Sequence, residues 1–361
     1  MAGECKWLSS PQPNPNEWVK GKIIGSGSFG AVHLAMDKAT GSLFVVKSAE
    51  SEAGLLSLKN ETKIIESLDS PFIVKCIGKD VSCGTNGERN YNLFIEYVEG
   101  GSLADVAEKF GGALDEKVIV LYTREILQGL KYLHKNGIVH SDLKCKNVLL
   151  GSSGNIKLAD FGCAKRLIDL KNNQVSSQSC KGIGGTPLWM APEVLRNEGL
   201  DFASDIWSLG CTIIEMATGR PPWDGDISNP MAAVFKIACS DDIPEFPAHF
   251  SLEGLDFLQR CLERNPGKRW TVEKLLDHPF ISGKELKTRG STEEDACSPA
   301  SVLDLGMYEN DLNNSPGVAP DCYRRIPFSS SFCHLENKLS HRDGTNIHWE
   351  SSDNWITVRT S

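Results

Sequence analysis

A polar, charged loop enclosed by apolar residues constrains this chain more than any other stretch. The loop, His140–Asn147, contains an Asp, two Lys and an Asn, and it lies between the apolar segments Ile138–Val139 and Val148–Leu150. Apolar flanks of this length predict two short buried strands on either side of the loop. Such strands would hold the polar groups in place, and we interpret the loop as a candidate active site.

A glycine-rich turn near the N-terminus is the second informative feature. Residues 18–24 alternate like a strand, three glycines fall within Gly25–Gly30, and strand-like residues resume at Val32–Leu34. In a dinucleotide-binding turn a helix would follow the glycines instead. Glycine lets the backbone lie close to a bound phosphate because it has no side chain. Taken alone, the pattern fits a flexible hairpin turn equally well.

A lysine and a glutamate follow on two further predicted elements. Leu43–Lys47 reads as a strand that ends in Lys47, and apolar residues at helical spacing predict a helix over 55–68 that carries Glu61. Each of these two residues also has an interpretation that involves no function. Lys47 could be a lysine on an edge strand, and Glu61 could lie on a solvated helix face.

Three later segments place the candidate loop in a larger domain. Leu93–Val98 reads as a buried strand with a glycine-rich exit. Residues 116–135 form the clearest amphipathic helix, and the Asn-Gly pair after it can end a helix. A strand over 156–159 leads into Asp160–Gly162, which is an Asp-Phe-Gly triplet.

In their order along the chain, these motifs resemble those of a eukaryotic protein kinase. The family's glycine loop, G-x-G-x-x-G-x-V, is matched at 25–32, and its catalytic loop, H-R-D-L-x-x-x-N, is matched at 140–147. D-F-G follows at 160–162 and A-P-E at 191–193. The departures are Ser141 in place of the usual Arg, and Phe44 and Val45 in the V-A-I-K motif. The resemblance covers residues 18–281.

The resemblance implies an α+β, bilobal protein-kinase fold. A small N-lobe would be built on an antiparallel sheet, and a large C-lobe would be helical. We expect an N-terminal leader over 1–17, a kinase domain over 18–281, and a regulatory or largely disordered C-terminal tail over 282–361.

The resemblance also implies ATP and Mg²⁺ as cofactors, and it assigns roles to residues. Asp142 would orient the substrate hydroxyl and accept its proton, and Lys144 would neutralise the migrating phosphoryl group. Asn147 and Asp160 would hold Mg²⁺. Thr186 would bridge Asp142 and Lys144. The residues expected around ATP are Ile24, Gly25, Gly27, Gly30, Val32, Lys47, Glu61, Glu96, Val98 and Leu149.

Three further residues are assigned supporting roles by the same resemblance. Asp205 would fix the catalytic loop by hydrogen bonds to its backbone. Arg269 would pair with Glu193 of the A-P-E motif.

Lys144 and the residues before Ala191–Glu193 resemble those of serine/threonine kinases. Within that class, the chain is most similar to the short plant members of the MEKK-type mitogen-activated protein (MAP) kinase kinase kinases. The implied substrates are MAP kinase kinases of a stress or hormone signalling cascade. Two alternatives stay open: a pseudokinase scaffold, and a serine/threonine kinase of another pathway. Lys47, Asp142 and Asp160, which pseudokinases usually lose, are all present.

The segment 163–185 reads as the activation loop, and Ser176, Ser177, Ser179 and Thr186 are its candidate substrate or activation-loop residues. The Arg that usually stands in place of Ser141 pairs with a phosphate on this loop. Serine cannot form that charge-assisted pair. Lys165 and Arg166, just after the Asp-Phe-Gly triplet, remain as possible partners for such a phosphate. We hypothesise that loop phosphorylation matters less here than in kinases that have the Arg.

Charge and composition exclude several other classes. The formal net charge of −9 argues against a general nucleic-acid binder. The 12 cysteines are dispersed without zinc-like spacing, which favours reduced thiols and a cytoplasmic or nuclear location. No secretory signal is evident, and no apolar run approaches the roughly 20 residues of a membrane span. Polar residues interrupt the longest candidate, Ile206–Ala217.

The tail is polar and has little periodicity, which favours disorder. Apolar islands interrupt it at 301–305, 326–328 and 349–358. Trp349 and Trp355 could dock on the kinase domain or on a regulatory partner, or they could fluctuate in solvent.

Overall fold

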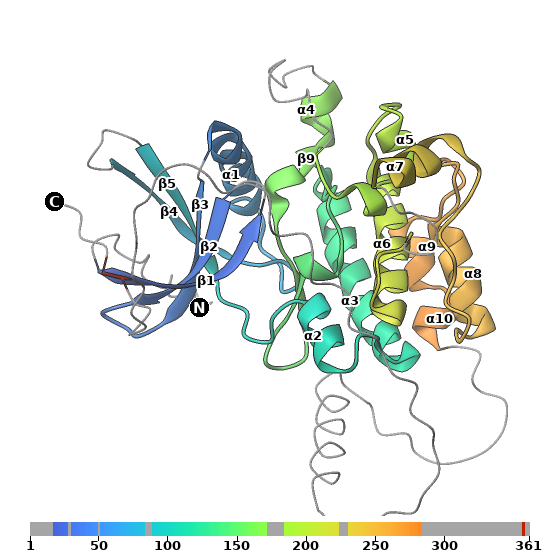
Figure 1. Ribbon diagram of the computed structural model, residues 1–361, viewed down its shortest axis with the longest axis horizontal. Coiled ribbons are helices and arrows are strands. Elements are labelled where there is room, and N and C mark those ends of the chain that lie inside the picture. The colour runs from blue at the N-terminus through green and yellow to red at the C-terminus, as the bar shows by residue number, and fades with distance from the viewer. Residues whose placement is uncertain are drawn as a thin grey trace, which may run out of the picture.

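The computed structural model describes residues 17–27, 30–49, 51–83, 89–171, 184–223, 230–283 and 356–357. A sheet with one helix forms a small lobe, and a helical assembly forms a larger one (Figure 1). This arrangement confirms the α+β, two-lobed fold predicted from the sequence.

The small lobe is built on an antiparallel sheet with strand order β10-β1-β2-β3-β5-β4. Its five principal strands are β1 (Trp18–Gly27), β2 (Gly30–Asp37), β3 (Leu43–Ala49), β4 (Cys76–Cys83) and β5 (Arg89–Glu96). Trp18, Phe44 and Phe94 come from three of these strands and pack edge-to-face, with ring centroids 5.5 to 6.1 Å apart. This aromatic cluster ties β1, which precedes the glycine turn, to the centre of the sheet.

The helix of the small lobe, α1 (Glu52–Ile65), begins one turn earlier than the predicted 55–68. Ser51 caps it, since its side chain accepts a hydrogen bond from the backbone N–H of Gly54 at 3.1 Å. At the other end the Ser67 hydroxyl donates to the carbonyl oxygen of Ile64 at 2.6 Å. The capping residues, rather than the apolar periodicity, therefore set the bounds of this helix.

The larger lobe is helical. Its helices are α2 (Leu103–Lys109), α3 (Glu116–Lys135), α4 (Leu167–Lys171), α5 (Pro192–Leu195), α6 (Phe202–Thr218), α7 (Pro230–Cys239), α8 (Leu252–Cys261), α9 (Val272–Leu276) and α10 (Pro279–Ser282). Helix α3 has the bounds that its periodicity predicts.

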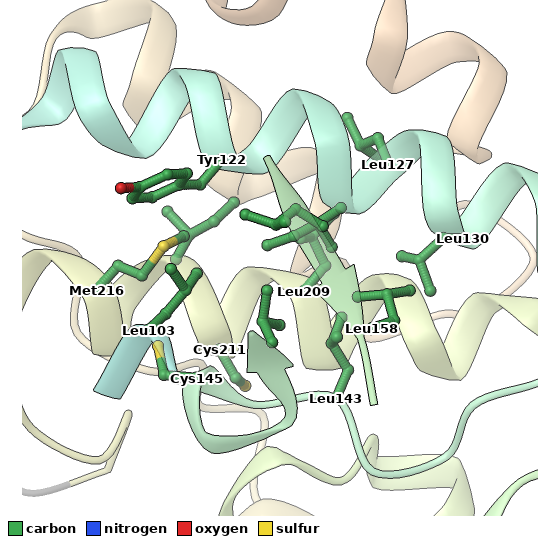
Figure 2. Packing of buried hydrophobic residues seen from close by; sticks show 14 of the residues in the cluster. Leu103, Tyr122, Leu127, Leu130, Leu143, Cys145, Leu158, Leu209, Cys211 and Met216 are labelled. Carbon is green, nitrogen blue, oxygen red and sulfur yellow. The ribbon is translucent and has the colours of Figure 1, made fainter. Parts of the chain in front are cut away.

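Helix α6 lies at the centre of the larger lobe, and nearly all of its side chains are buried. Leu209, Cys211 and Met216 of α6 belong to the same main hydrophobic core as Tyr122 and Leu130 of α3 (Figure 2). The apolar composition of residues 206–217 therefore reflects a helix that protein surrounds on all sides. Among the described residues, none of the helices has the length and hydrophobicity that a membrane crossing would need.

Short strands connect the candidate loop to its surroundings. β6 (Ile138–Val139) pairs with β9 (Lys165–Arg166), and β7 (Val148–Leu150) pairs with β8 (Ile156–Leu158). The two strands predicted to flank the loop are present and buried, but each pairs with a different partner.

Beyond Gly283 the structure describes only β10 (Ile356–Thr357), whose backbone pairs with Val19 and Lys20 of β1. These two residues belong to one of the apolar islands noted in the tail. The other two islands lie outside the described residues.

The ion pair between Glu193 and Arg269 is buried and joins α5 to the segment before α9. We predict that Arg269→Met lowers the free energy of unfolding by about 3–5 kcal/mol, because it leaves the Glu193 carboxylate buried without its partner. The double variant Glu193→Gln/Arg269→Met should recover part of this loss, since no unpaired charge remains. Urea unfolding checks both.

Arg260 is a matched control for this prediction, because it pairs with Asp256 at the surface at 2.8 Å. Arg260→Met should cost less than about 1 kcal/mol. Equal losses of unfolding free energy in the Arg260 and Arg269 variants would contradict the prediction.

Candidate active site

A cleft of about 640 Å³ lies between the lobes, a size suited to a small-molecule ligand. All the predicted ATP-binding residues line it except Gly27, which pairs with Gly30 where β1 turns into β2. Gly30 has φ 153°, and a Cβ there would lie 2.1 Å from the carbonyl oxygen of Ser48. Only glycine therefore fits at this position of the turn.

Three charged side chains meet on the small-lobe side of the cleft. The Lys47 Nζ lies 2.7 Å from Glu61 Oε1 and 3.0 Å from Asp160 Oδ1. Burial opposes the charge of Lys47, but the two carboxylates outweigh it and raise the pKa of Lys47. The positive charge of Lys47 in turn lowers the pKa of Asp160. The lysine therefore stays protonated and Asp160 stays ionised at neutral pH.

The backbone that follows β5 offers the groups expected to meet an adenine ring. The N–H of Glu96 donates to the carbonyl oxygen of Lys75 at 3.0 Å. Its side chain accepts from the Lys157 Nζ at 2.7 Å. Since its N–H is engaged, the carbonyl is the only backbone group with which Glu96 itself could meet a ligand. Val98 and Leu149 line the same part of the cleft.

The catalytic-loop residues form a hydrogen-bonded cluster with Thr186. The Thr186 hydroxyl donates to Asp142 Oδ1 at 2.7 Å, and the Lys144 Nζ donates to the Thr186 hydroxyl. Lys144 also lies 3.0 Å from Asp142 Oδ2. Thr186 thus bridges Asp142 and Lys144, which is the contact inferred from the sequence.

Asn147 and Asp160, the predicted metal ligands, both line the cleft. The Asn147 amide nitrogen donates to the carbonyl and carboxylate oxygens of Asp142, which leaves its amide oxygen for a cation. Amide and carboxylate oxygens are ligands that suit Mg²⁺. Among the residues that the structure describes, no group of three His, Cys, Asp or Glu could hold a metal. The pair therefore fits a Mg²⁺ that is shared with nucleotide phosphates rather than held in an all-protein site.

A buried carboxylate on α6 fixes the loop from behind. Asp205 is fully buried and accepts hydrogen bonds from the backbone N–H groups of His140 and Ser141, both at 2.9 Å. Burial opposes its ionised form, but the hydrogen bond and charge of His134 outweigh this and hold the pKa of Asp205 below its usual range. The sequence predicted the two backbone contacts but not the role of His134.

Glu215 is a structural residue of the site that the sequence analysis missed. It accepts hydrogen bonds from the N–H of Cys145 at 3.0 Å and from the indole N–H of Trp189 at 2.9 Å. In the sequence it only interrupted an apolar run. A carboxylate inside a buried helix needs compensating donors, and this was the signal that could have identified it.

Comparison with known proteins agrees with this geometry. The family model of the protein kinase domain matches residues 18–281. This chain belongs to the protein kinase family. It is 42% identical over 355 residues to "Mitogen-activated protein kinase kinase kinase 17" of Arabidopsis thaliana, covering 95% of this chain and 93% of the relative.

Two further relatives are informative about the group. "Mitogen-activated protein kinase kinase kinase 18" of Arabidopsis thaliana is 37% identical, over 95% of this chain and 99% of the relative. "Mitogen-activated protein kinase kinase kinase 2" of Arabidopsis thaliana is 36% identical over 84% of this chain, and the alignment covers only 47% of that longer relative. This kinase is therefore a serine/threonine kinase of the MAP kinase kinase kinase group, as predicted, and nothing favours a pseudokinase.

Ser141 is the position at which this kinase departs from the usual catalytic loop. Its backbone is left-handed, with φ 66°, and its hydroxyl is buried without a hydrogen-bond partner in the part of the chain that the structure describes. The side chain has neither the charge nor the length to reach a loop phosphate. Ser176, Ser177 and Ser179 lie outside the described residues.

We predict that the triple variant Ser176→Ala, Ser177→Ala, Ser179→Ala keeps most of its kinase activity, because position 141 carries no cation for a phosphate on these serines. The measurement is initial-rate phosphorylation of a protein substrate. Thr186→Ala serves as the positive control for loss, since it breaks the bridge between Asp142 and Lys144. Complete inactivity of the triple variant with an unchanged melting temperature would contradict the prediction.

Proposed function

We propose that this kinase transfers the γ-phosphoryl group of ATP, in the presence of Mg²⁺, to serine or threonine hydroxyls of MAP kinase kinases. One observation carries the proposal. A phosphate-facing cluster (Lys47, Glu61 and Asp160) lines the cleft, and a hydroxyl-facing cluster (Asp142, Lys144 and Thr186) reaches the same cleft through Lys144. The names of the relatives support the substrate class.

On the substrate side, Asp142 would orient the hydroxyl of the protein substrate and accept its proton. Its two oxygens have different hydrogen-bond donors: Oδ1 accepts from Thr186, and Oδ2 accepts from Lys144 and Asn147. The carboxylate therefore cannot rotate freely. Lys144 would place its positive charge beside the transferred group.

On the nucleotide side, Lys47 would bind the α- and β-phosphates and Glu61 would keep it in position. Asn147 and Asp160 would hold the metal. Bound MgATP would supply the phosphoryl group and the cation that offsets its charge. Residues 25–30 would cover the phosphates with backbone alone. Every one of these assignments depends on positioning and charge rather than on covalent chemistry with the protein.

We also propose a cytoplasmic or nuclear location, together with a regulatory contact for the tail. Six cysteines are free thiols, which suits a reducing compartment: Cys76, Cys145, Cys163, Cys211, Cys239 and Cys261. The two relatives of similar length align over 95% of this chain, so their similarity extends beyond the kinase domain into the tail.

Removing either key charge should stop the reaction without unfolding the protein. We expect Asp142→Asn and Lys47→Met each to lower turnover by at least ~100-fold, because a general base alone contributes about that much. Lys79→Met is the matched control, since Lys79 pairs with Glu66 at the surface of the same lobe. Turnover like that of the parent protein in either active-site variant would refute the assignment.

The substrate class is tested by a phosphorylation screen over catalytically inactive MAP kinase kinases, with a generic basic protein as comparison. We expect one or more MAP kinase kinases to be phosphorylated much faster than the basic protein, and none by Asp142→Asn. Efficient phosphorylation of the basic protein alone would instead favour a kinase of another pathway.

A further inference from the structure

Helix α1 is bound to the segment after Asp160 by more than its glutamate. The Asn60 side-chain amide donates to the carbonyl oxygen of Gly162 at 3.3 Å and to that of Ala164 at 3.0 Å. The Ser57 hydroxyl donates to the same Gly162 oxygen at 3.2 Å. Residues 57, 60 and 61 are spaced three and four apart, so they share one face of the helix.

The segment that receives these hydrogen bonds is closely packed. Phe161 and Ala164 are fully buried, and β9 continues from them into a strand pair with β6. The approach is also close, since a Cβ on Gly162 would lie 2.7 Å from the Ser57 hydroxyl oxygen. The carbonyls of 162–164 therefore form a fixed acceptor surface against which α1 can be placed.

The position of α1 decides whether the phosphate-binding lysine is in place. Glu61 lies on this helix, and its Oε1 accepts from the Lys47 Nζ at 2.7 Å and from the N–H of Phe161 at 3.3 Å. If α1 moved outward, Glu61 would leave Lys47. The bonds from Asn60 and Ser57 resist that movement.

The ion pair between α1 and the segment after Asp160 lies at the surface: Lys63 Nζ is 3.8 Å from Asp169 Oδ2, and both side chains reach solvent. Ser141 carries no cation, and Arg166 donates to the Ser67 hydroxyl at the end of α1. Both contacts that α1 makes through Asn60, and the one through Ser57, are hydrogen bonds between neutral groups. They need no phosphate to form.

We propose that Asn60, supported by Ser57, is the positioning residue that holds α1 and Glu61 in the catalytic arrangement. The inference rests on the roles proposed above for Lys47 and Glu61. It explains how a kinase with Ser141 keeps its lysine–glutamate pair: neutral bonds to the carbonyls of Gly162 and Ala164 replace a phosphate-dependent contact.

The test compares substitutions at Asn60 that differ in their donors. Asn60→Asp keeps the size but sets carboxylate oxygens against two carbonyls, and Asn60→Ala removes the side chain. We expect kcat to fall about tenfold in Asn60→Ala, which equals about 1.4 kcal/mol, and further in Asn60→Asp. The KM for the protein substrate should not change. Asn60→Gln keeps the amide donors and should recover at least part of the activity lost in Asn60→Ala. Lys59→Ala, on the exposed side of the same helix, is the matched control.

A double-variant cycle separates positioning from general stability. In a Glu61→Gln background the helix position matters little, so adding Asn60→Ala should change the residual single-turnover rate less than about twofold. Fully additive losses would overturn the inference, as would parental kcat in both Asn60→Ala and Asn60→Asp. If Asn60→Asp fails to fold, Asn60→Ala and Asn60→Gln carry the same comparison.

The cycle also distinguishes this inference from the function on which it rests. Parental activity in Glu61→Gln would overturn the proposed role of Glu61 and the inference together. A strong loss in Glu61→Gln with parental activity in the Asn60 variants would overturn only the inference.

Discussion

The hydrogen bonds that Asp205 accepts from the backbone of the catalytic loop are the interaction on which the rest of the site depends. They attach His140 and Ser141 to α6, the most deeply buried helix of the larger lobe. A charge in that position would be costly without donors, and the loop backbone and His134 supply them. Burial therefore has a functional result, because the catalytic loop is held in place when its backbone is hydrogen-bonded to the core.

The same helix also positions the substrate side of the cleft. Ser208 donates to the carbonyl oxygen of Trp189, and Glu215 accepts from both the Trp189 side chain and the backbone of Cys145. Helix α6 thus orients the catalytic loop and the segment that carries Thr186 from one rigid surface. This explains why Thr186 can reach Asp142 at 2.7 Å although the two residues lie far apart in the chain.

The nucleotide side depends on a different kind of constraint. Lys47, Glu61 and Asp160 come from the sheet, from α1 and from the larger lobe, so their contacts report how the lobes and α1 are placed relative to one another. Salt bridges of this kind contribute more to geometry than to stability, because desolvation offsets much of the attraction. In a MAP kinase kinase kinase with Ser141, the neutral contacts of Asn60 and Ser57 extend the same positioning without a phosphate.

Local pattern was enough to predict the bounds of α3, because helical periodicity depends on neighbours in the chain. The two-lobed fold and the residues that line the cleft were predicted from the resemblance to protein kinases, which short glycine and Asp motifs carry. The bounds of α1 depended on caps, and the partners of β6 and β7 on segments that follow later. The contacts His134–Asp205, Glu215–Cys145 and Asn60–Ala164 join residues 70 to 104 positions apart. Such pairs are determined only by the folded core, since a buried polar group bonds to the donor or acceptor that tertiary packing places next to it.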